Sequence, residues 1–134
     1  MSCKSAIFVS NTGAQTVALG GTIDLGSIIR RFGCAVNLNG NGITLGASGY
    51  YKTDVSVTAA PTAAGVVTVS LYLDGVAVPG ATASATAAAA GDSVVLAFPA
   101  LVRLVGQNTG GTLTLVLSGE ASTVENVAVV VEKI

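Results

Sequence analysis

The stretch Tyr50–Thr58 reads YYKTDVSVT, and residues suited to burial alternate in it with polar residues. Because side chains on a strand alternate between its two faces, this pattern predicts a β-strand with one buried face. The side chains expected on that face are those of Tyr51, Thr53, Val55 and Val57. The next run, Val66–Leu73, has the same alternation and ends at Asp74-Gly75, a strong signal for a tight hairpin. This part of the chain therefore predicts an antiparallel sheet.

The same alternation recurs on both sides of that stretch. Further strands are expected at Ala6–Ser10, Thr16–Leu19, Ala35–Leu38, Ile43–Leu45, Val76–Val78, Val94–Phe98, Leu101–Val105, Leu113–Leu117 and Val127–Ile134. Ala81–Ala90 is expected to be extended, because it has no amphipathic helical period and lies between glycines. Ile23–Phe32 is expected to be an irregular connection. About eight to ten short strands without a long helix indicate a β-sandwich or barrel.

The composition points to an oligomer. Hydrophobic residues make up 51% of the 134 residues and charged residues only 10%, against roughly a quarter charged in an average domain. Either small hydroxyl residues cover the surface, or the surface is buried against copies of the same chain. The second alternative is favoured because several strands, such as Val129-Val130-Val131, are apolar on both faces.

Several functional classes find no support in the sequence. The six basic residues are scattered and the net charge is −1, which argues against nucleic acid as a partner. No run reaches the ~18 apolar residues of a membrane span. The four-residue apolar run near the N-terminus is too short for a signal peptide. We therefore expect a complete product made in a cytoplasm, with no membrane partner.

The chain offers little for catalysis or cofactor binding. It has no His, so no Ser-His or Cys-His pair can form, and none of its seven carboxylates is adjacent to another. Asn39-Gly40-Asn41-Gly42 predicts a hairpin, because neither a helix nor a Lys follows it as in a phosphate-binding loop. We predict a non-enzymatic protein with no catalytic, cofactor-binding or metal-binding residues. Calcium on loop oxygens remains an alternative, with donors at Asp24, Asn39, Asn41 and Asn108.

The two cysteines, Cys3 and Cys34, are too few for a disulfide framework, and without His or a CxxC pair they do not indicate a zinc site. Two half-buried thiols are the favoured interpretation. A bridge that ties the N-terminal strand to the region of Cys34 is the alternative.

The order of these strands resembles the C1q/TNF-like jelly rolls. Gly49–Val57 is similar to the Gly-x-Tyr strand of that family, and Val67–Gly80 is similar to its next hairpin, which ends in Val-Pro-Gly. Thr112–Leu117 and Asn126–Ile134 resemble its last two strands. The similarity is greatest to the bacterial and phage branch, which includes the C-terminal domain of the spore-surface protein BclA. This chain lacks the collagen-like stalk of BclA.

The resemblance implies an all-β, two-sheet antiparallel jelly-roll sandwich that forms a homotrimer. Residues 1–12 would be an N-terminal arm or first strand that could attach to a particle, and residues 13–134 the jelly roll. The expected role is that of a trimeric decoration or stabilising protein on the outside of a phage capsid, in contact with the major capsid protein or another virion component. The alternatives are a receptor- or glycan-binding tip of a phage fibre, and a spore- or cell-surface protein.

Two sets of residues are candidates for these contacts. Those expected in the trimer interface or in the core are Tyr51, Val55, Val57, Tyr72, Leu115 and Val129. Those expected to attach the protein to a particle are Lys4, Ile7 and Phe8.

Overall fold

Eleven β-strands make up the regular structure of the described residues, 4–104 and 111–134, in the computed structural model. They are β1 Ala6–Asn11, β2 Gln15–Val17, β3 Ser27–Phe32, β4 Val36–Asn39, β5 Gly42–Leu45, β6 Gly49–Pro61, β7 Gly65–Leu73, β8 Val76–Ala87, β9 Val94–Leu104, β10 Gly111–Gly119 and β11 Ser122–Lys133. Within these residues there is no helix long and apolar enough to cross a membrane.

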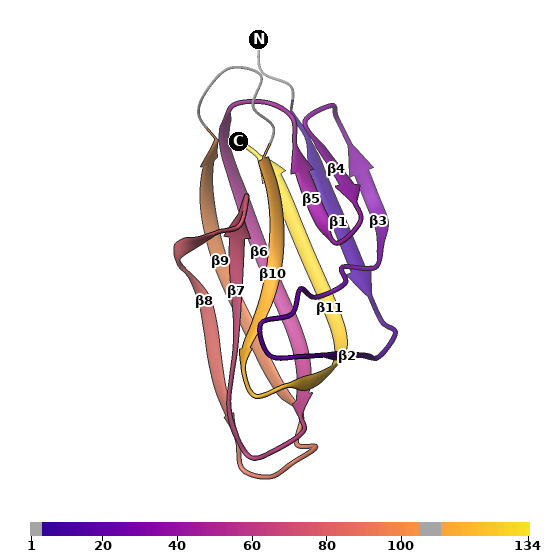
Figure 1. The fold of residues 1–134 in the computed structure, drawn as a ribbon. Coiled ribbons are helices and arrows are strands. Elements are labelled where there is room, and N and C mark those ends of the chain that lie inside the picture. The colour runs from indigo at the N-terminus through magenta and orange to yellow at the C-terminus, as the bar shows by residue number, and fades with distance from the viewer. Residues whose placement is uncertain (1–3, 105–110) are drawn as a thin grey trace.

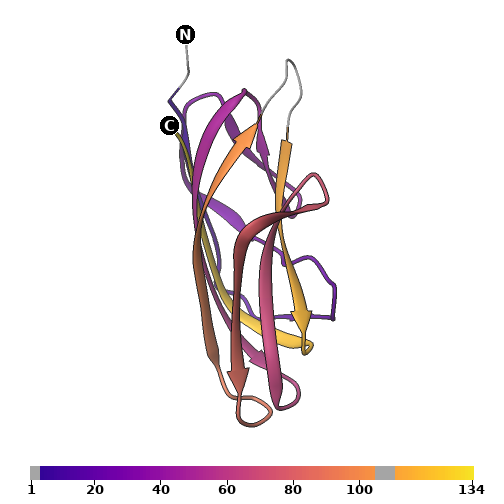
Figure 2. The same ribbon diagram turned by 90° about the vertical axis from the view of Figure 1, so that its left-hand side faces the viewer.

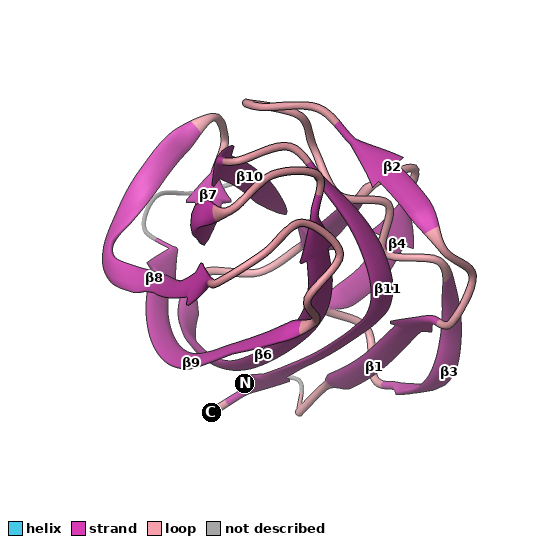
Figure 3. Cartoon of the chain, turned by 90° about the horizontal axis from the view of Figure 1, so that it is seen from below, coloured by secondary structure: helices cyan, strands magenta, loops and turns pink. Residues whose placement is uncertain are grey.

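The strands form two antiparallel sheets that face each other (Figures 1 and 2). Sheet A has the order β3-β1-β11-β6-β9, and β2 also pairs with β11. Sheet B has the order β4-β5-β10-β7-β8. Seen along the strands, β8 and β9 lie side by side and close one side of the sandwich (Figure 3). Strands distant in sequence are neighbours in both sheets, as the jelly-roll prediction requires.

The core lies between the sheets and is built by the alternation seen in the sequence. Tyr51, Thr53, Val55 and Val57 are all buried on the inner face of β6, as predicted. From sheet B, Val69, Leu71 and Leu115 meet them from the opposite side. Burying side chains of this size contributes about 1.5–3 kcal/mol each, so this apolar layer is the main source of stability.

The predicted hairpins are confirmed. Asn39 pairs with Gly42 across the turn between β4 and β5. Leu73 pairs with Val76 across Asp74 and Gly75, which have φ angles of 51° and 82°. Two consecutive positive φ angles are characteristic of a tight hairpin turn with the twist of the flanking strands, and they explain the Asp-Gly sequence there.

Three expectations about strand boundaries were wrong. The second half of the expected irregular connection is an edge strand, β3, which pairs with β1. Pro99 does not split its region into two strands, because β9 continues through it, paired only with β6. A proline is tolerated there because an edge strand needs hydrogen bonds on one side only. Val76–Val78 and the extended Ala81–Ala87 region form one strand, β8, which is also at an edge.

Candidate assembly surface

The outward-facing residues of sheet A form a surface on which large apolar side chains are exposed. We call it the sheet A surface; its members are Ala6, Phe8, Arg30, Phe32, Tyr50, Lys52, Asp54, Val95, Ala97, Pro99, Leu101, Arg103, Val130 and Glu132. Phe32 is 61% exposed and Leu101 59%. Every second residue of β9, from Val95 to Arg103, faces outward and is exposed. Exposed apolar residues on neighbouring strands mark a surface suited to binding another protein.

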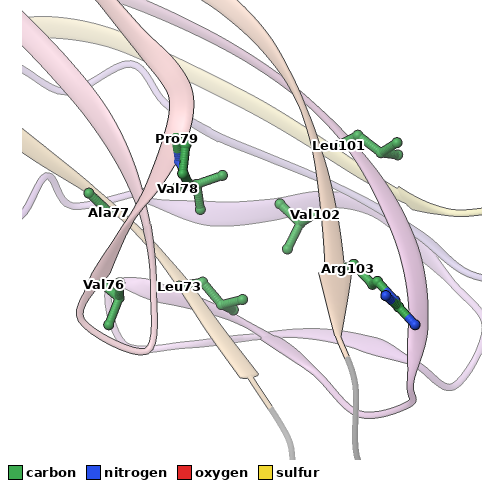
Figure 4. Close-up of a pocket in the computed structure, with 8 residues that line it drawn as sticks. All are labelled: Leu73, Val76, Ala77, Val78, Pro79, Leu101, Val102 and Arg103. Atoms are coloured by element: carbon green, nitrogen blue, oxygen red, sulfur yellow. The ribbon is translucent and has the colours of Figure 1, made fainter.

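This surface is hollowed along β9. One concave region, of about 270 Å³, lies where the β7–β8 hairpin meets the end of β9 (Figure 4). Leu73, Val76 and Pro79 contribute to one wall, and Leu101 and Val102 to the other. Leu101 also borders a second hollow with Lys52 and Ile134. The exposed side chain of Leu101 is therefore a knob with an apolar hollow on each side.

A smaller hollow lies at the other edge of the same surface. Phe8, Phe32 and Val130 line it together with Arg30 and Arg31. These residues come from β1, β3 and β11, whose register places Phe8 opposite both Arg30 and Val130. Protruding side chains and hollows at both edges of one sheet face can be matched by a complementary protein surface.

Charges of both signs are interspersed with these apolar groups. Lys52 and Glu132 are cross-strand partners on β6 and β11, and Asp54 lies opposite Val130. The guanidinium carbon of Arg103 lies 5.7 Å from the centre of the Tyr50 ring, within the range of a cation–π contact. A surface that carries both signs can be complementary to another copy of itself.

The outward face of sheet B is different in character. We call its hydroxyl-bearing residues the sheet B surface: Thr44, Thr68, Ser70, Tyr72, Thr82, Ser84, Thr86, Thr112, Thr114 and Ser118. The strands of sheet B also expose two large apolar side chains, those of Val66 and Val76. The hydroxyls pair across strands: Thr68 Oγ1 is 2.8 Å from Ser84 Oγ, and Ser70 Oγ is 3.0 Å from Thr82 Oγ1. No strand of sheet B contains a charged residue.

Most residues predicted for the interface or core lie in the core. Tyr51, Val57 and Leu115 are at most 1% exposed, and Val55 and Val129 at most 3%. Tyr72 is half-buried and points outward from sheet B. The Tyr51 hydroxyl donates a hydrogen bond of 2.5 Å to the Ala47 carbonyl. Burial raises the pKa of this phenol above its usual value, and the hydrogen bond to Ala47 opposes that rise.

The three residues predicted to attach the protein to a particle have different positions. Lys4 is exposed just before β1, and Phe8 is half-buried on the sheet A surface. Ile7 is 1% exposed and packs in the core, so its side chain cannot contact a particle. Residues 6–11 are a paired strand between β3 and β11 rather than a free arm.

Sequence reasoning missed the residues that dominate the sheet A surface, above all Phe32, Tyr50 and Leu101. The sequence did indicate two residues of this surface: Phe8, as a candidate attachment residue, and Val130, as part of a strand that is apolar on both faces. The missed signal was the alternation of Val95, Ala97, Pro99 and Leu101 opposite the buried Leu96 and Phe98. Breaking this segment at Pro99 had concealed that pattern.

The structure bears on the predicted calcium donors and on one of the two cysteines. Among the described residues, no three His, Cys, Asp or Glu side chains lie close enough together to hold a metal ion. One Asp24 carboxylate oxygen accepts the Gly26 N–H at 2.9 Å, and Asn108 lies outside the described residues.

Cys34 is disulfide-bonded and exposed, which corrects the favoured interpretation of it as a half-buried thiol. Cys3, the other cysteine of the sequence, lies outside the described residues.

Comparison with known proteins supports the fold but not a sequence family. No protein-family model and no curated protein sequence matches the chain. Among solved structures, murine APRIL at pH 5.0 is similar with a TM-score of 0.74 and 9% identity, over 98% of this chain and 99% of that one. The globular domain of zebrafish complement 1qA protein has a TM-score of 0.68 and 12% identity, over 98% and 97%.

A vertex protein has a similar architecture. The PRD1 vertex protein P5 is similar with a TM-score of 0.60 and 14% identity, over 100% of this chain and 99% of that one. At such low identities the similarity concerns the fold alone. The chain is thus an all-β protein with the two-sheet antiparallel jelly-roll fold of TNF and C1q domains.

Proposed function

We propose that the protein is a non-enzymatic structural component of a phage virion, a homotrimer that decorates or stabilises the outer surface of the capsid. The observation that carries this proposal is the sheet A surface, with its exposed Phe32 and Leu101 and its charges of both signs. A second copy of the same chain is the occupant that this surface fits, and the trimer is the assembly that the family resemblance implies. The fold shared with the PRD1 vertex protein P5 supports a virion role.

Burial of the sheet A surface would also account for the low charge of the chain. Exposed apolar groups such as Leu101 are costly in water, at roughly 25 cal/mol for each Å² that could be buried. Packing Leu101 into the hollows of a neighbouring copy removes that cost. The interspersed charges would then fix the register between copies.

The trimer is tested by light scattering on the purified protein at micromolar concentration. We expect a mass of three times 13.1 kDa. A mass of one chain under these conditions would exclude the proposed assembly.

The virion role is tested by immunogold electron microscopy on particles from cells that produce the protein. Label spread over capsid shells supports the proposal, whereas label confined to fibre tips or to bacterial surfaces contradicts it.

A glycan- or receptor-binding fibre tip is a second candidate, and one observation favours it. Tyr72 is the aromatic residue on the uncharged sheet B surface, next to Thr114 in the register of β7 and β10. An aromatic ring among hydroxyl groups can stack on a sugar and hydrogen-bond to it. A glycan array with the wild-type protein and with Tyr72→Ala tests this. A specific signal that Tyr72→Ala abolishes would favour the fibre-tip role over decoration.

A further inference from the structure

The run Asn39-Gly40-Asn41-Gly42 contains two asparagines that are each followed by glycine, and the proposed function uses neither of them. The other asparagines of the sequence all precede residues larger than glycine; they are Asn11, Asn37, Asn108 and Asn126. The run forms the turn between β4 and β5, at the edge of sheet B (Figure 1). Asn39, Gly40 and Asn41 are exposed, whereas Gly42 is buried. The same dipeptide therefore occurs twice in this turn, in two different surroundings.

An asparagine followed by glycine can lose its side-chain amide without an enzyme. The glycine backbone nitrogen loses its proton and attacks the side-chain carbonyl carbon, the bond from that carbon to the side-chain nitrogen breaks, and ammonia leaves. The resulting five-membered imide takes up one water and opens to aspartate or, at its other carbonyl, to isoaspartate. The reaction therefore needs a glycine N–H without a hydrogen-bond acceptor and a backbone with room to turn toward the side chain. Glycine supplies that freedom best.

The hairpin restrains the second of the two glycine amides. The Gly46 N–H donates to the Ala35 carbonyl at 2.8 Å. Hydrogen-bonded pairs alternate with unbonded pairs along an antiparallel ladder. The pair Asn39 and Gly42, four residues nearer the turn on each strand, is therefore hydrogen-bonded as well, and the Gly42 N–H is donated to the Asn39 carbonyl. A Cβ built on Gly42 would also clash with the methyl carbon of Thr112, so this backbone has no room to turn.

The first glycine amide is not restrained in this way. Gly40 lies in the turn itself and has a φ angle of 62°. Apart from its chain neighbours, no atom lies within 4 Å of a Cβ built on it. Among the described residues, the Gly40 N–H has no acceptor, because the ladder ends at the pair Asn39 and Gly42. The Gly40 nitrogen is thus available for attack on the Asn39 side chain.

We propose that Asn39 is a self-modification site, which the chain converts to aspartate and isoaspartate, and that the fold protects Asn41. The product places a carboxylate in β4, whereas the strands of sheet B otherwise contain no charged residue. Isoaspartate also adds a methylene to the backbone and so disturbs the pair with Gly42. The loss of ammonia is irreversible, so the modified fraction grows with the age of the protein. This inference goes beyond the proposed virion role and does not depend on it.

The test is peptide mapping of the full chain after incubation in ¹⁸O-labelled water at neutral and at alkaline pH. After reduction, trypsin releases residues 32–52, which contain both Asn-Gly pairs. Fragmentation in a mass spectrometer assigns the heavy oxygen to Asn39 or Asn41. We expect Asn39 to react about tenfold faster in the native protein, because the Gly42 amide can attack only after its hydrogen bond opens. The reaction at Asn39 should be faster at alkaline pH, because the Gly40 nitrogen must lose its proton.

The same chain unfolded in urea separates the effect of the fold from that of the sequence. Both asparagines are followed by glycine, so without the hairpin their rates should become similar. Equal rates in the native protein, or faster reaction at Asn41, would overturn the proposal. So would a native Asn39 that stays unmodified while the unfolded chain reacts.

Asn39→Gln and Asn41→Gln are the matched variants, because the longer glutamine side chain would have to close a six-membered ring, which is far slower. Both positions are exposed, so the hairpin should tolerate either change. Isoelectric focusing of aged native samples should show a species with one more negative charge in the wild type and in Asn41→Gln, but not in Asn39→Gln. The same acidic species in Asn39→Gln would place the modification elsewhere and contradict the proposal.

Discussion

The two sheets have the same antiparallel construction but present opposite surfaces. Of the charged side chains, those that lie in strands are all in sheet A: Arg30, Arg31, Lys52, Asp54, Arg103, Glu125, Glu132 and Lys133. The strands of sheet B have none. Sheet A exposes Phe32, Tyr50, Val95, Leu101 and Val130. Sheet B exposes fewer large apolar residues, Val66 and Val76, and its outward positions are mainly Ser and Thr.

This difference shows two ways in which a chain with few charged residues can cover the outer faces of its sheets. On sheet B the hydroxyls of Thr68, Ser70, Thr82 and Ser84 pair with one another and can also bind water. That face can therefore remain exposed without charges. Sheet A has no comparable hydroxyl cover at Leu101 or Phe32, which is why we assign self-association to it. The composition left two alternatives, a surface covered by small hydroxyl residues and a surface buried against copies of the chain. Sheet B fits the first and sheet A the second.

The largest expected effect is on assembly. Leu101→Asp places a carboxylate on the β9 knob, opposite Lys52. Taking this charge out of water in a trimer would cost about 4 kcal/mol per chain, of which a pair with Lys52 would offset only a part. Because Leu101 is exposed in the single chain, folding should be unaffected. Light scattering should therefore report monomers. Ser84→Asp, on the sheet B surface, is the matched control and should stay trimeric; if it dissociates instead, the functional assignment of the two faces is reversed.

Substituting a second leucine tests the difference between the inner and the outer faces of the sheets. Leu115 is 1% exposed on the inner face of sheet B. Leu115→Ala should lower the free energy of unfolding by about 3 kcal/mol, because it leaves a cavity. Leu101→Ala should change that quantity far less, when the wild type and both variants are unfolded in urea at a concentration at which light scattering reports monomers. Equal losses would mean that Leu101 already stabilises the single chain.

Sheet A also has an unpaired hydroxyl on its inner face, whereas the hydroxyls of sheet B pair with one another on its outer face. Thr53, on the inner face of β6, has a fully buried hydroxyl oxygen with no hydrogen-bond partner. Thr53→Val removes an unsatisfied polar group at nearly constant volume and should raise the free energy of unfolding by about 1 kcal/mol. Thr68→Val, which breaks the pair with Ser84, serves as the control and should give no comparable gain. A loss of stability in Thr53→Val would indicate a water or a partner at that hydroxyl.

The smallest expected effect concerns the hydroxyl pairs of sheet B. A double-mutant cycle on Thr68→Ala and Ser84→Ala should give a coupling energy of about 0.5 kcal/mol, as for other cross-strand pairs. Urea unfolding of the four proteins measures it. The unbonded pair Thr68 and Thr114 provides the reference cycle, which should show no coupling. A coupling energy larger than that of an ordinary cross-strand pair would indicate that the hydroxyls of the sheet B surface form a rigid network and do not mainly bind water.

Much of the fold was predictable because its signals are local. Alternation identified β6, β7 and β10, and Asn39-Gly40 and Asp74-Gly75 located two hairpins. The candidate surface was less predictable, because exposure depends on which face of a strand meets the other sheet. Ile7 shows this, since an apolar residue near the N-terminus could have been an anchor but lies in the core.

The sequence by itself determined the class of structure and the position of most strands, since strand period and turn chemistry act over a few neighbouring residues. Only the tertiary structure decided that β3 is a strand, that β9 continues through Pro99, and that Ile7 lies in the core. Pairing registers join residues as distant as Ala6 and Glu132. Such registers depend on how the whole chain packs its apolar faces together, and no short segment contains that information.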